Sequence, residues 1–253
     1  MYAIHAGKAA LNAHYKRIGW NARAQEGAVD GWYQTKFTLK EEPLVSILIP
    51  NKDHTDDLDV CLNSFFERAD YQNYEFIIIE NNSVLPETFA YYEKIEKEHD
   101  NVKVVYWEAG FNYSAINNFG FKFAKGDYIM LLNNDVELIT PDIFQSMLGF
   151  CMRPEVGIVG AKLLYNDHTV QHAGVLVGAG GLADHVFKGI HEDDPGYMGR
   201  AISSQDVSAV TAACLLVKRS VYEEVGGLEE EFQVAFNDVD FCLKVRKAGY
   251  LIV

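Results

Sequence analysis

Short apolar runs alternate with amphipathic segments through the middle of the chain. The runs have the length of buried β-strands and end in polar or turn-forming residues; they are Val45–Ile49, Phe76–Ile79, Val102–Trp107 and Tyr128–Leu132. The segments between them carry apolar residues at helical spacing, and we expect helices to start at Thr55, Ser114 and Thr140–Pro141. Strands that alternate with helices predict an α/β fold with a mostly parallel central sheet flanked by helices.

The start of the chain follows a different pattern. It predicts a short helix near Ala3–Leu11 and an extended arm over Gly27–Leu39, and it holds none of the motifs described below. We therefore divide the chain near Glu41–Pro43 into a short N-terminal extension, residues 1–43, and a main domain, residues 44–253.

Beyond residue 151 the alternation is looser. A strand is expected over Gly157–Lys162, and residues 165–206, which are rich in glycine, aspartate and histidine, predict a long mobile loop region. A last amphipathic helix is expected over Asp238–Ala248, with Gly249 as its C-terminal stop.

Polar clusters follow three of the predicted strands. They are Asn51–Asp53, Glu80–Ser83 and Asn133–Asp135. Ligands of open parallel sheets bind beyond the carboxyl ends of the strands, so we expect these clusters to converge on one site.

The charge limits what this site can bind. Lysine and arginine total 22 against 36 aspartates and glutamates, a formal net charge of −14. A nucleic-acid-binding protein needs a basic surface, so no nucleic acid partner is expected. A phosphate ligand on so acidic a protein needs a local positive centre, and a divalent metal ion supplies one.

No segment approaches the ~20 apolar residues of a membrane span, and the N-terminus lacks a secretory apolar block. Four cysteines, without a zinc-site or CxxC spacing, predict small core residues in a reducing compartment. We expect a cytoplasmic location, at the inner face of a membrane.

Four segments together carry a resemblance to a known family. They are Val45–Pro50, Glu80–Ser83, Gly126–Asp135 and Asn237–Lys244. In this order they resemble the family 2 glycosyltransferases of GT-A fold, from Leu44 to the end of the chain. The rhamnosyltransferase-like subgroup is the most similar, since it also has a segment like Val170–Gly174. The resemblance implies a hexosyl or deoxyhexosyl transferase of cell-surface polysaccharide assembly, and a domain that continues beyond Val253.

The resemblance implies a metal and diphosphate site at Asn133, Asn134 and Asp135. A carboxylate at a strand end can ligate Mg²⁺ or Mn²⁺ through hard oxygen. The family commonly has Asp-x-Asp here, so in this chain an amide, Asn133, replaces the first carboxylate. The alternative is a plain turn, which asparagine and aspartate also favour.

The resemblance further implies a nucleotide-binding set. It comprises Pro50, Asn51, Asp53, Glu80, Asn82, Asn117, Asn133 and Asn134. Glu80 is expected to accept hydrogen bonds from the base or the ribose. The alternative for each of these residues is a role in a turn or a helix cap. The implied donor is a dTDP or UDP sugar.

Asp238 is the expected catalytic base. An acceptor alcohol is a weak nucleophile until its proton is removed, and a carboxylate can take that proton. The alternative is a charge that merely stabilises a helix N-terminus. Contacts to the acceptor or the donor sugar are expected from Asp240, His172, His185 and Thr211.

We therefore expect transfer of a sugar from a nucleotide diphosphate donor to the hydroxyl of a saccharide or lipid-linked acceptor, with inversion. A non-catalytic nucleotide-sugar or carbohydrate binding module is the alternative. A sugar nucleotidyltransferase is disfavoured, because Pro50–His54 lacks the glycine-rich basic loop of such enzymes.

Overall fold

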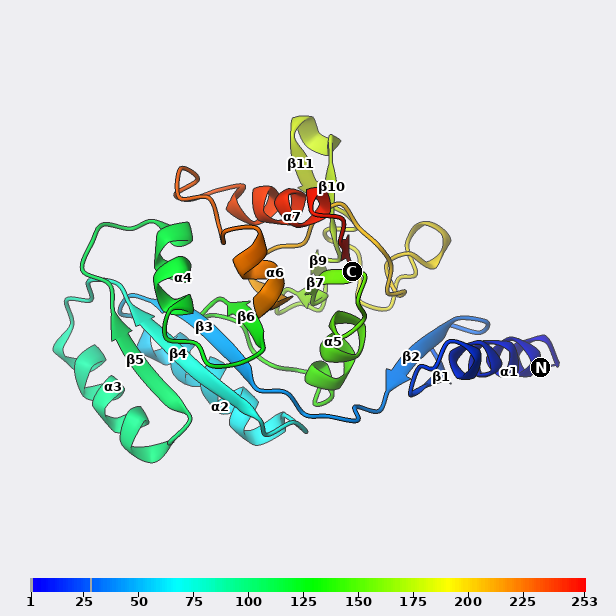
Figure 1. Cartoon of the computed structure of the whole chain (residues 1–253), viewed down its shortest axis with the longest axis horizontal. Coiled ribbons are helices and arrows are strands. Elements are labelled where there is room, and N and C mark those ends of the chain that lie inside the picture. Colours follow the sequence, from blue (N-terminus) through cyan, green and yellow to red (C-terminus); the bar gives the residue numbers. More distant parts are fainter. Residues whose placement is uncertain (1, 28) are drawn as a thin grey trace.

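A seven-stranded sheet forms the centre of the molecule (Figure 1). The computed structural model describes residues 2–27 and 29–253. The strand order is β13-β7-β12-β6-β3-β4-β5, with bounds β3 Val45–Asn51, β4 Tyr74–Glu80, β5 Val102–Tyr106, β6 Tyr128–Leu132, β7 Val156–Gly160, β12 Cys214–Lys218 and β13 Leu251–Ile252. Strands β3 to β6 are mutually parallel, and β12 runs antiparallel to both β6 and β7. The predicted α/β fold with a mostly parallel sheet is confirmed.

The sheet is apolar on both faces because helices cover both. Ile47 and Ile49 face one core cluster, whereas Leu48 between them faces the other. The first cluster is covered by α2 Thr55–Arg68, α3 Pro86–Glu98 and α5 Ile143–Cys151. The second is covered by α4 Tyr113–Phe121, α6 Arg219–Glu224 and α7 Asn237–Lys247. All four cysteines are free and buried, as predicted.

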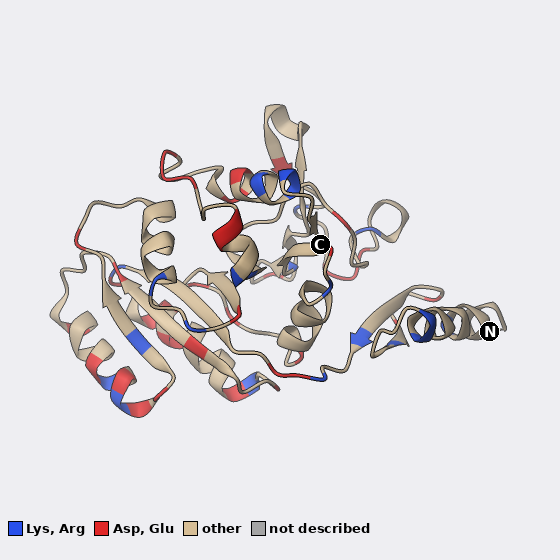
Figure 2. Ribbon diagram, in the orientation of Figure 1, with Lys and Arg blue, Asp and Glu red and all other residues tan. Residues whose placement is uncertain are grey.

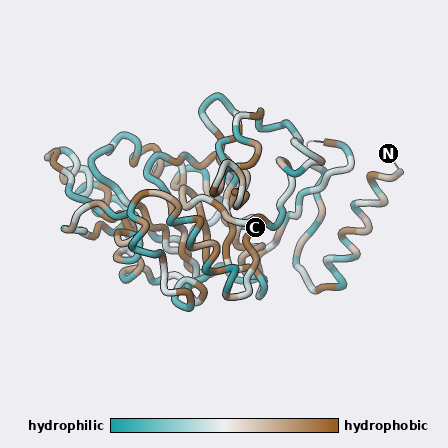
Figure 3. Tube along the Cα trace, turned by 90° about the horizontal axis from the view of Figure 1, so that it is seen from above, coloured by the Kyte–Doolittle hydropathy of each residue, from teal (hydrophilic) through white to brown (hydrophobic). Residues whose placement is uncertain are grey.

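The N-terminal part is a helix, α1 Tyr2–Arg17, followed by a hairpin of β1 Ala22–Glu26 and β2 Tyr33–Phe37. It lies to one side of the main body (Figure 1 and Figure 3). The hairpin reaches the main body through α5, where Phe37 packs on Phe150 and Lys36 pairs with Asp142 at 2.7 Å. The predicted extended arm is therefore the second half of a hairpin; residue 28 of that arm lies outside the described residues.

The region expected to be a long mobile loop contains short antiparallel pairs. They are β8 Leu163–Leu164 with β9 Val170–His172, and β10 Val175–Val177 with β11 Ala183–His185. Two single turns of 3-10 helix, η1 Ala179–Gly181 and η2 Tyr197–Gly199, complete it. The loop prediction was wrong for these segments, because they are too short to show a strand pattern in the sequence.

The helix start predicted at Thr55 is confirmed, although the capping position is His54, in the left-handed region, and not Thr55. The starts predicted at Ser114 and Thr140–Pro141 were wrong in detail. Helix α4 is capped by Asn112, whose side chain accepts from the backbone of Ala115. Helix α5 begins only after Asp142. Contacts with other segments fix these starts, and local sequence does not carry that information. None of the helices in the described residues is long and apolar enough to cross a membrane.

Candidate functional site

The predicted polar clusters meet at the carboxyl edge of the sheet. Asn134, after β6, donates to the Oδ1 atom of Asn51 at the end of β3, at 2.6 Å. The Nδ2 atom of Asn51 donates to the hydroxyl of Tyr92 on α3, at 2.8 Å. That hydroxyl donates to Glu80 at the end of β4, at 2.8 Å. One hydrogen-bonded chain therefore joins residues from all three predicted clusters.

Glu80 is a buried member of this chain. It is 3% exposed, and both of its carboxylate oxygens accept hydrogen bonds from within the protein. One accepts from the backbone of Ser83, and the other accepts from the Ser83 hydroxyl at 2.6 Å and from Tyr92. Glu80 thus holds the loop after β4 in its observed shape.

Asp53 fixes the same loop from the other side. Its φ of +53° places it in the left-handed region, which aspartate tolerates better than most residues. Its carboxylate accepts from the backbone of Val84 and Leu85 and from the Thr88 hydroxyl, each at 3.1 Å. Desolvation raises the pKa of Asp53, but these hydrogen bonds outweigh it and leave the pKa below its usual value. Pro50 lies in β3, and its neighbours Ile49 and Asn51 both pair with residues of β4.

Two buried amides, one directly after Glu80 and one on α4, lack a partner for one atom. Among the described residues, the Nδ2 atom of Asn81 and the Oδ1 atom of Asn117 make no hydrogen bond, although the residues are only 4% and 0% exposed. An unsatisfied buried polar group costs about 1–3 kcal/mol, so such atoms are suited to a ligand. We predicted Glu80 and Asn82 as nucleotide contacts but not Asn81. The only indication of Asn81 in the sequence was its position in the Glu80–Ser83 cluster. Asn82 instead bonds the backbone of Ala109, at 2.7 Å.

Replacing Tyr92 with phenylalanine is expected to destabilise the fold by about 1–3 kcal/mol, because Asn51 and Glu80 each lose a buried partner. Urea denaturation measures this loss. The matched control is Tyr91→Phe on the same helix, because no group of the described residues forms a hydrogen bond with the Tyr91 hydroxyl. Removing a buried hydroxyl without a partner breaks no hydrogen bond, so we expect the control to be no less stable than the wild type. Equal losses in both variants would contradict the network.

The candidate metal ligand Asp135 is exposed, directly after Asn133 and Asn134. Within residues 2–27 and 29–253, no three or more histidine, cysteine, aspartate or glutamate side chains form a group that could hold a metal ion. One carboxylate and one amide do not make a resident metal site. They do fit a hard cation that binds jointly with a diphosphate, since Mg²⁺ typically takes one or two carboxylates plus phosphate oxygens.

Asp238 lies in the first turn of α7, opposite the segment that leads into β12. Its Oδ2 atom accepts from the backbone of Ala212 at 3.3 Å, and its Oδ1 atom accepts from Val239 at 2.8 Å. The hydroxyl of Tyr113 donates to the carbonyl of Ala212, at 3.2 Å. Burial raises the pKa of Tyr113, and the charge of Asp238 adds to this effect. Tyr113 therefore stays protonated beside the aspartate.

The charges of α7 follow its dipole, with acidic residues in the first turn and basic residues in the last (Figure 2). Asp240, two residues after Asp238, is half-buried, and its Oδ2 atom makes no hydrogen bond with any residue that the structure describes. Burial raises the pKa of Asp240, Lys244 opposes that rise, and Glu229 adds to it. The helix dipole explains why carboxylates are tolerated in this turn. It does not explain why the Oδ2 atom of Asp240 has no hydrogen-bond partner among the described residues.

The segment Thr211–Ala213 connects the two halves of the site. The carbonyl of Ala213 accepts from the backbone of Asn133 at 3.0 Å, and Ala212 bonds Asp238. The Thr211 hydroxyl accepts from the backbone of Ala213 at 3.3 Å. This short segment therefore contacts both the candidate base and the candidate metal site, and it sets the distance between them.

His172 and His185 support this segment. The backbone of Thr211 donates to the Nε2 atom of His172 at 3.4 Å, so the Nδ1 atom of His172 carries the proton. That atom donates to the Nδ1 atom of His185, at 2.9 Å. Burial lowers the pKa of His172 to about 3, and His185 adds to the effect, so His172 is neutral at physiological pH. The pair holds the backbone of Thr211 in place.

Comparisons with known proteins agree on one family. Residues 46–226 match the model of glycosyl transferase family 2. The uncharacterised protein y4gI of Sinorhizobium fredii is 42% identical over 254 residues, which cover 98% of this chain and 28% of that protein. The O-antigen biosynthesis protein RfbC of Myxococcus xanthus is 37% identical over 252 residues, which cover 99% of this chain and 20% of that protein. This chain thus spans less than a third of either relative.

A solved structure has the same fold. It is the mannosyltransferase PcManGT from Pyrobaculum calidifontis, in complex with GDP-Man and Mn²⁺. The TM-score is 0.65 at 14% sequence identity, and the match covers 99% of this chain and 63% of that one. At this identity, the likeness is evidence of the fold alone.

Proposed function

This chain belongs to glycosyl transferase family 2, and from that premise we propose that it transfers a sugar from a nucleotide diphosphate donor to a saccharide hydroxyl. The predicted family is confirmed, and so is the predicted GT-A fold. The observation that carries the proposal is that the Thr211–Ala213 segment bonds both Asp238 and Asn133, which lies two residues before Asp135. A metal-binding carboxylate and a proton-accepting carboxylate are the two groups that this reaction needs.

The donor nucleotide is assigned to the carboxyl ends of β3 and β4. Its contacts in this proposal are Pro50, Asn51, Asp53, Glu80, Asn81, Asn82 and Asn117, with Asn133 and Asn134 at the diphosphate. Glu80 and Asp53 act mainly by holding the loops, since protein donors bond both oxygens of Glu80 and the Oδ1 atom of Asp53. Asn81 and Asn117 offer the free amide atoms. A dTDP or UDP donor is part of the proposal.

Asp135 and the donor diphosphate would hold the metal ion, and Asn133 would be a weaker ligand. A divalent cation bound there neutralises the charge that develops on the departing diphosphate. The mannosyltransferase PcManGT, which has the same fold, is in complex with GDP-Man and Mn²⁺, which supports a divalent cation as part of the proposal.

Asp238 acts as the general base. It takes the proton of the acceptor hydroxyl as the acceptor oxygen bonds to the anomeric carbon, while the bond from that carbon to the diphosphate oxygen breaks. Such a single displacement inverts the anomeric configuration. Tyr113 and the backbone of Ala212 keep Asp238 in place, and His172, His185 and Thr211 support the same segment.

The biological setting is cell-surface polysaccharide assembly, in a rhamnosyltransferase-like subgroup. The relative RfbC, named for O-antigen biosynthesis, supports this setting. So does the low-salt glycan biosynthesis hexosyltransferase Agl10 of Haloferax volcanii, 20% identical over 76% of this chain and 62% of that protein. With a lipid-linked acceptor, the reaction would take place at the inner face of a membrane. We also propose that residues 44–253 are the GT-A domain and residues 1–43 an extension docked on α5.

Thermal unfolding with UDP, dTDP and GDP, with and without Mn²⁺, tests the donor site. A ligand that binds only the folded protein adds about 2.7 kcal/mol at a hundredfold excess over its Kd. For a chain of this size, each kcal/mol raises the Tm by about 2–4 °C. We expect a rise of several degrees with one diphosphate in Mn²⁺ and a much smaller rise with the matching monophosphate. The absence of a rise with every diphosphate would count against the proposal.

One observation favours a second candidate, a non-catalytic nucleotide-sugar binding module. Asp135 is the only carboxylate in the Asn133–Asp135 turn, and the described residues hold no group of three metal-ligating side chains. Such a module would bind the nucleotide in the same place but release no diphosphate from the donor.

A further inference from the structure

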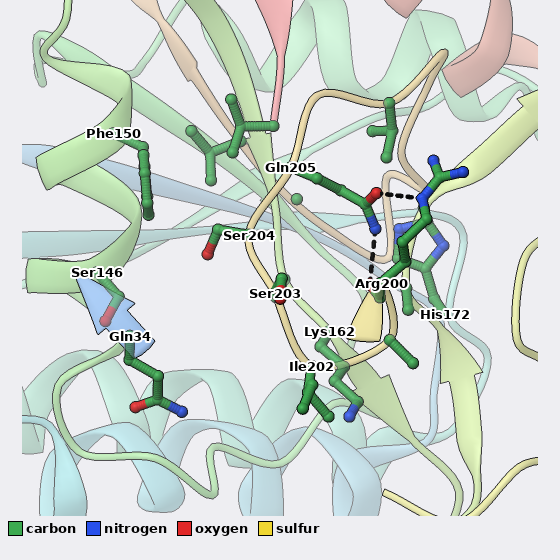
Figure 4. Close-up of a pocket in the computed structure, with 18 of the residues that line it drawn as sticks. Gln34, Ser146, Phe150, Lys162, His172, Arg200, Ile202, Ser203, Ser204 and Gln205 are labelled. Carbon is green, nitrogen blue, oxygen red and sulfur yellow. Dashed lines mark hydrogen bonds between the residues drawn. The ribbon is translucent and has the colours of Figure 1, made fainter. Parts of the chain in front are cut away.

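A cavity of about 360 Å³ lies at the carboxyl edge of the sheet, on the β7 side of the candidate site (Figure 4). It borders Gly160 at the end of β7, Val210 ahead of β12 and Val253 after β13. None of the residues proposed above for donor, metal or base lines it, whereas His172, which supports Thr211, does. Its size is at the lower end of the ~300–1,000 Å³ typical of small-molecule sites.

The cavity is separated from the candidate base by one short segment. His172 lines the cavity, and its Nε2 atom accepts from the backbone of Thr211. The next residue, Ala212, donates to Asp238. A ligand in the cavity would therefore lie on the far side of Thr211 from the carboxylate that takes the acceptor proton.

The walls combine aromatic rings with neutral hydrogen-bonding groups. Figure 4 shows Gln34, Ser146 and Phe150 on one side, facing a loop that carries Ser203, Ser204 and Gln205. Trp32 adds a second large ring to the lining. Amides and hydroxyls both donate and accept, as sugar hydroxyls do, and aromatic faces suit the C–H faces of sugar rings.

The charges at the cavity balance. Lys162 and Arg200 line it, and so do Glu192 and Asp193. The Nζ atom of Lys162 donates to the carbonyl of Glu192 at 2.7 Å, and Arg200 donates to Gln205, also at 2.7 Å. Burial lowers the pKa of Lys162, and the two carboxylates oppose that effect. This lining favours a neutral ligand over a phosphate or a uronate.

The N-terminal hairpin forms part of the wall of this cavity. Gly199, with a φ of +72°, lies against the Trp32 ring, and a Cβ atom at Gly199 would clash with that ring. Trp32 therefore packs directly on the loop that carries Arg200 and Ser203. The hairpin forms one wall of the cavity and also fixes the opposite wall.

We propose that this cavity binds one or two neutral sugar residues of the acceptor, with the N-terminal extension as one wall. That the saccharide is the acceptor depends on the proposed function; that it binds here depends only on the cavity.

Saturation-transfer NMR with the intact chain tests the site. The probes are the methyl glycosides of glucose, galactose, mannose and rhamnose, without nucleotide or metal. We expect ring-proton signals from at least one glycoside, and an affinity about tenfold weaker in Gln34→Ala and Trp32→Ala, from lost hydrogen bonding and ring contact. The control is Gln25→Ala, because Gln25 is exposed, pairs with Gln34 in the hairpin and does not line the cavity.

Two results would overturn the inference. One is the absence of signals from all four glycosides with the wild-type chain. The other is an equal response of Gln34→Ala and Gln25→Ala. Nucleotide binding, measured separately by thermal unfolding, reports on the proposed function alone, so saccharide binding without nucleotide binding would contradict that function and support the cavity.

Discussion

Asp238→Asn is expected to lower kcat for sugar transfer by about 10²–10⁴-fold, the usual contribution of a general base. The amide cannot take the acceptor proton, yet its oxygen can still accept a hydrogen bond from Ala212. The fold and the donor site should therefore survive. Steady-state kinetics measure kcat and the KM for donor, and thermal unfolding checks the fold.

Asp240→Asn is the matched control for this prediction. Asp240 lies in the same helical turn, but its Oδ2 atom has no partner in the part of the chain that the structure describes. We expect its substitution to act on the KM for acceptor and to change kcat by less than about tenfold. If Asp238→Asn leaves kcat unchanged, or if both variants lower it equally, Asp238 is not the base.

Removing the carboxylate of Asp135 should have the second large effect. In Asp135→Ala, nucleotide diphosphate in Mn²⁺ should bind no more tightly than it does to the wild type in chelator, because no other carboxylate lies in the Asn133–Asp135 turn. Calorimetric titration of the nucleotide, with and without Mn²⁺, measures the difference. Mn²⁺ alone should bind weakly to either protein, since a single carboxylate and an amide form an incomplete shell.

Glu137→Ala provides the comparison. Glu137 is a carboxylate two residues further on, paired with Arg68 at 2.8 Å and half-exposed. Its loss should leave the Mn²⁺-dependent part of nucleotide binding intact. A similar loss in both variants would mean that the general negative charge of the loop, not Asp135, binds the metal.

Some parts of the fold follow from the spacing of apolar residues and from the position of polar residues at strand ends. These parts could be predicted from the sequence. The apolar runs at β3, β4 and β6 are buried on both faces, so they are visible in the sequence. The convergence of Asn51, Glu80 and Asn134 follows from parallel strands ending at one edge. Those three residues lie in one hydrogen-bonded network.

Other features depend on partners that are distant in sequence. An apolar run in the sequence does not indicate in which direction its strand runs in the sheet. The antiparallel position of β12 between β6 and β7 could therefore not be predicted. Glu80 stays a predicted nucleotide contact, but its hydrogen bonds with Tyr92 and Ser83 and the unpartnered amide atom of Asn81 could not be predicted. The docking of the hairpin on α5 rests on Phe37 and Phe150, whose pairing no local pattern indicates.

The most direct test of the central claim is turnover by the wild-type chain. Release of nucleotide diphosphate from UDP, dTDP and GDP sugars is followed in Mn²⁺ and in chelator. The account predicts release from at least one donor class, dependent on Mn²⁺ and accelerated by a saccharide acceptor. Tight binding of a nucleotide sugar with no release from any donor would contradict it and identify a binding module.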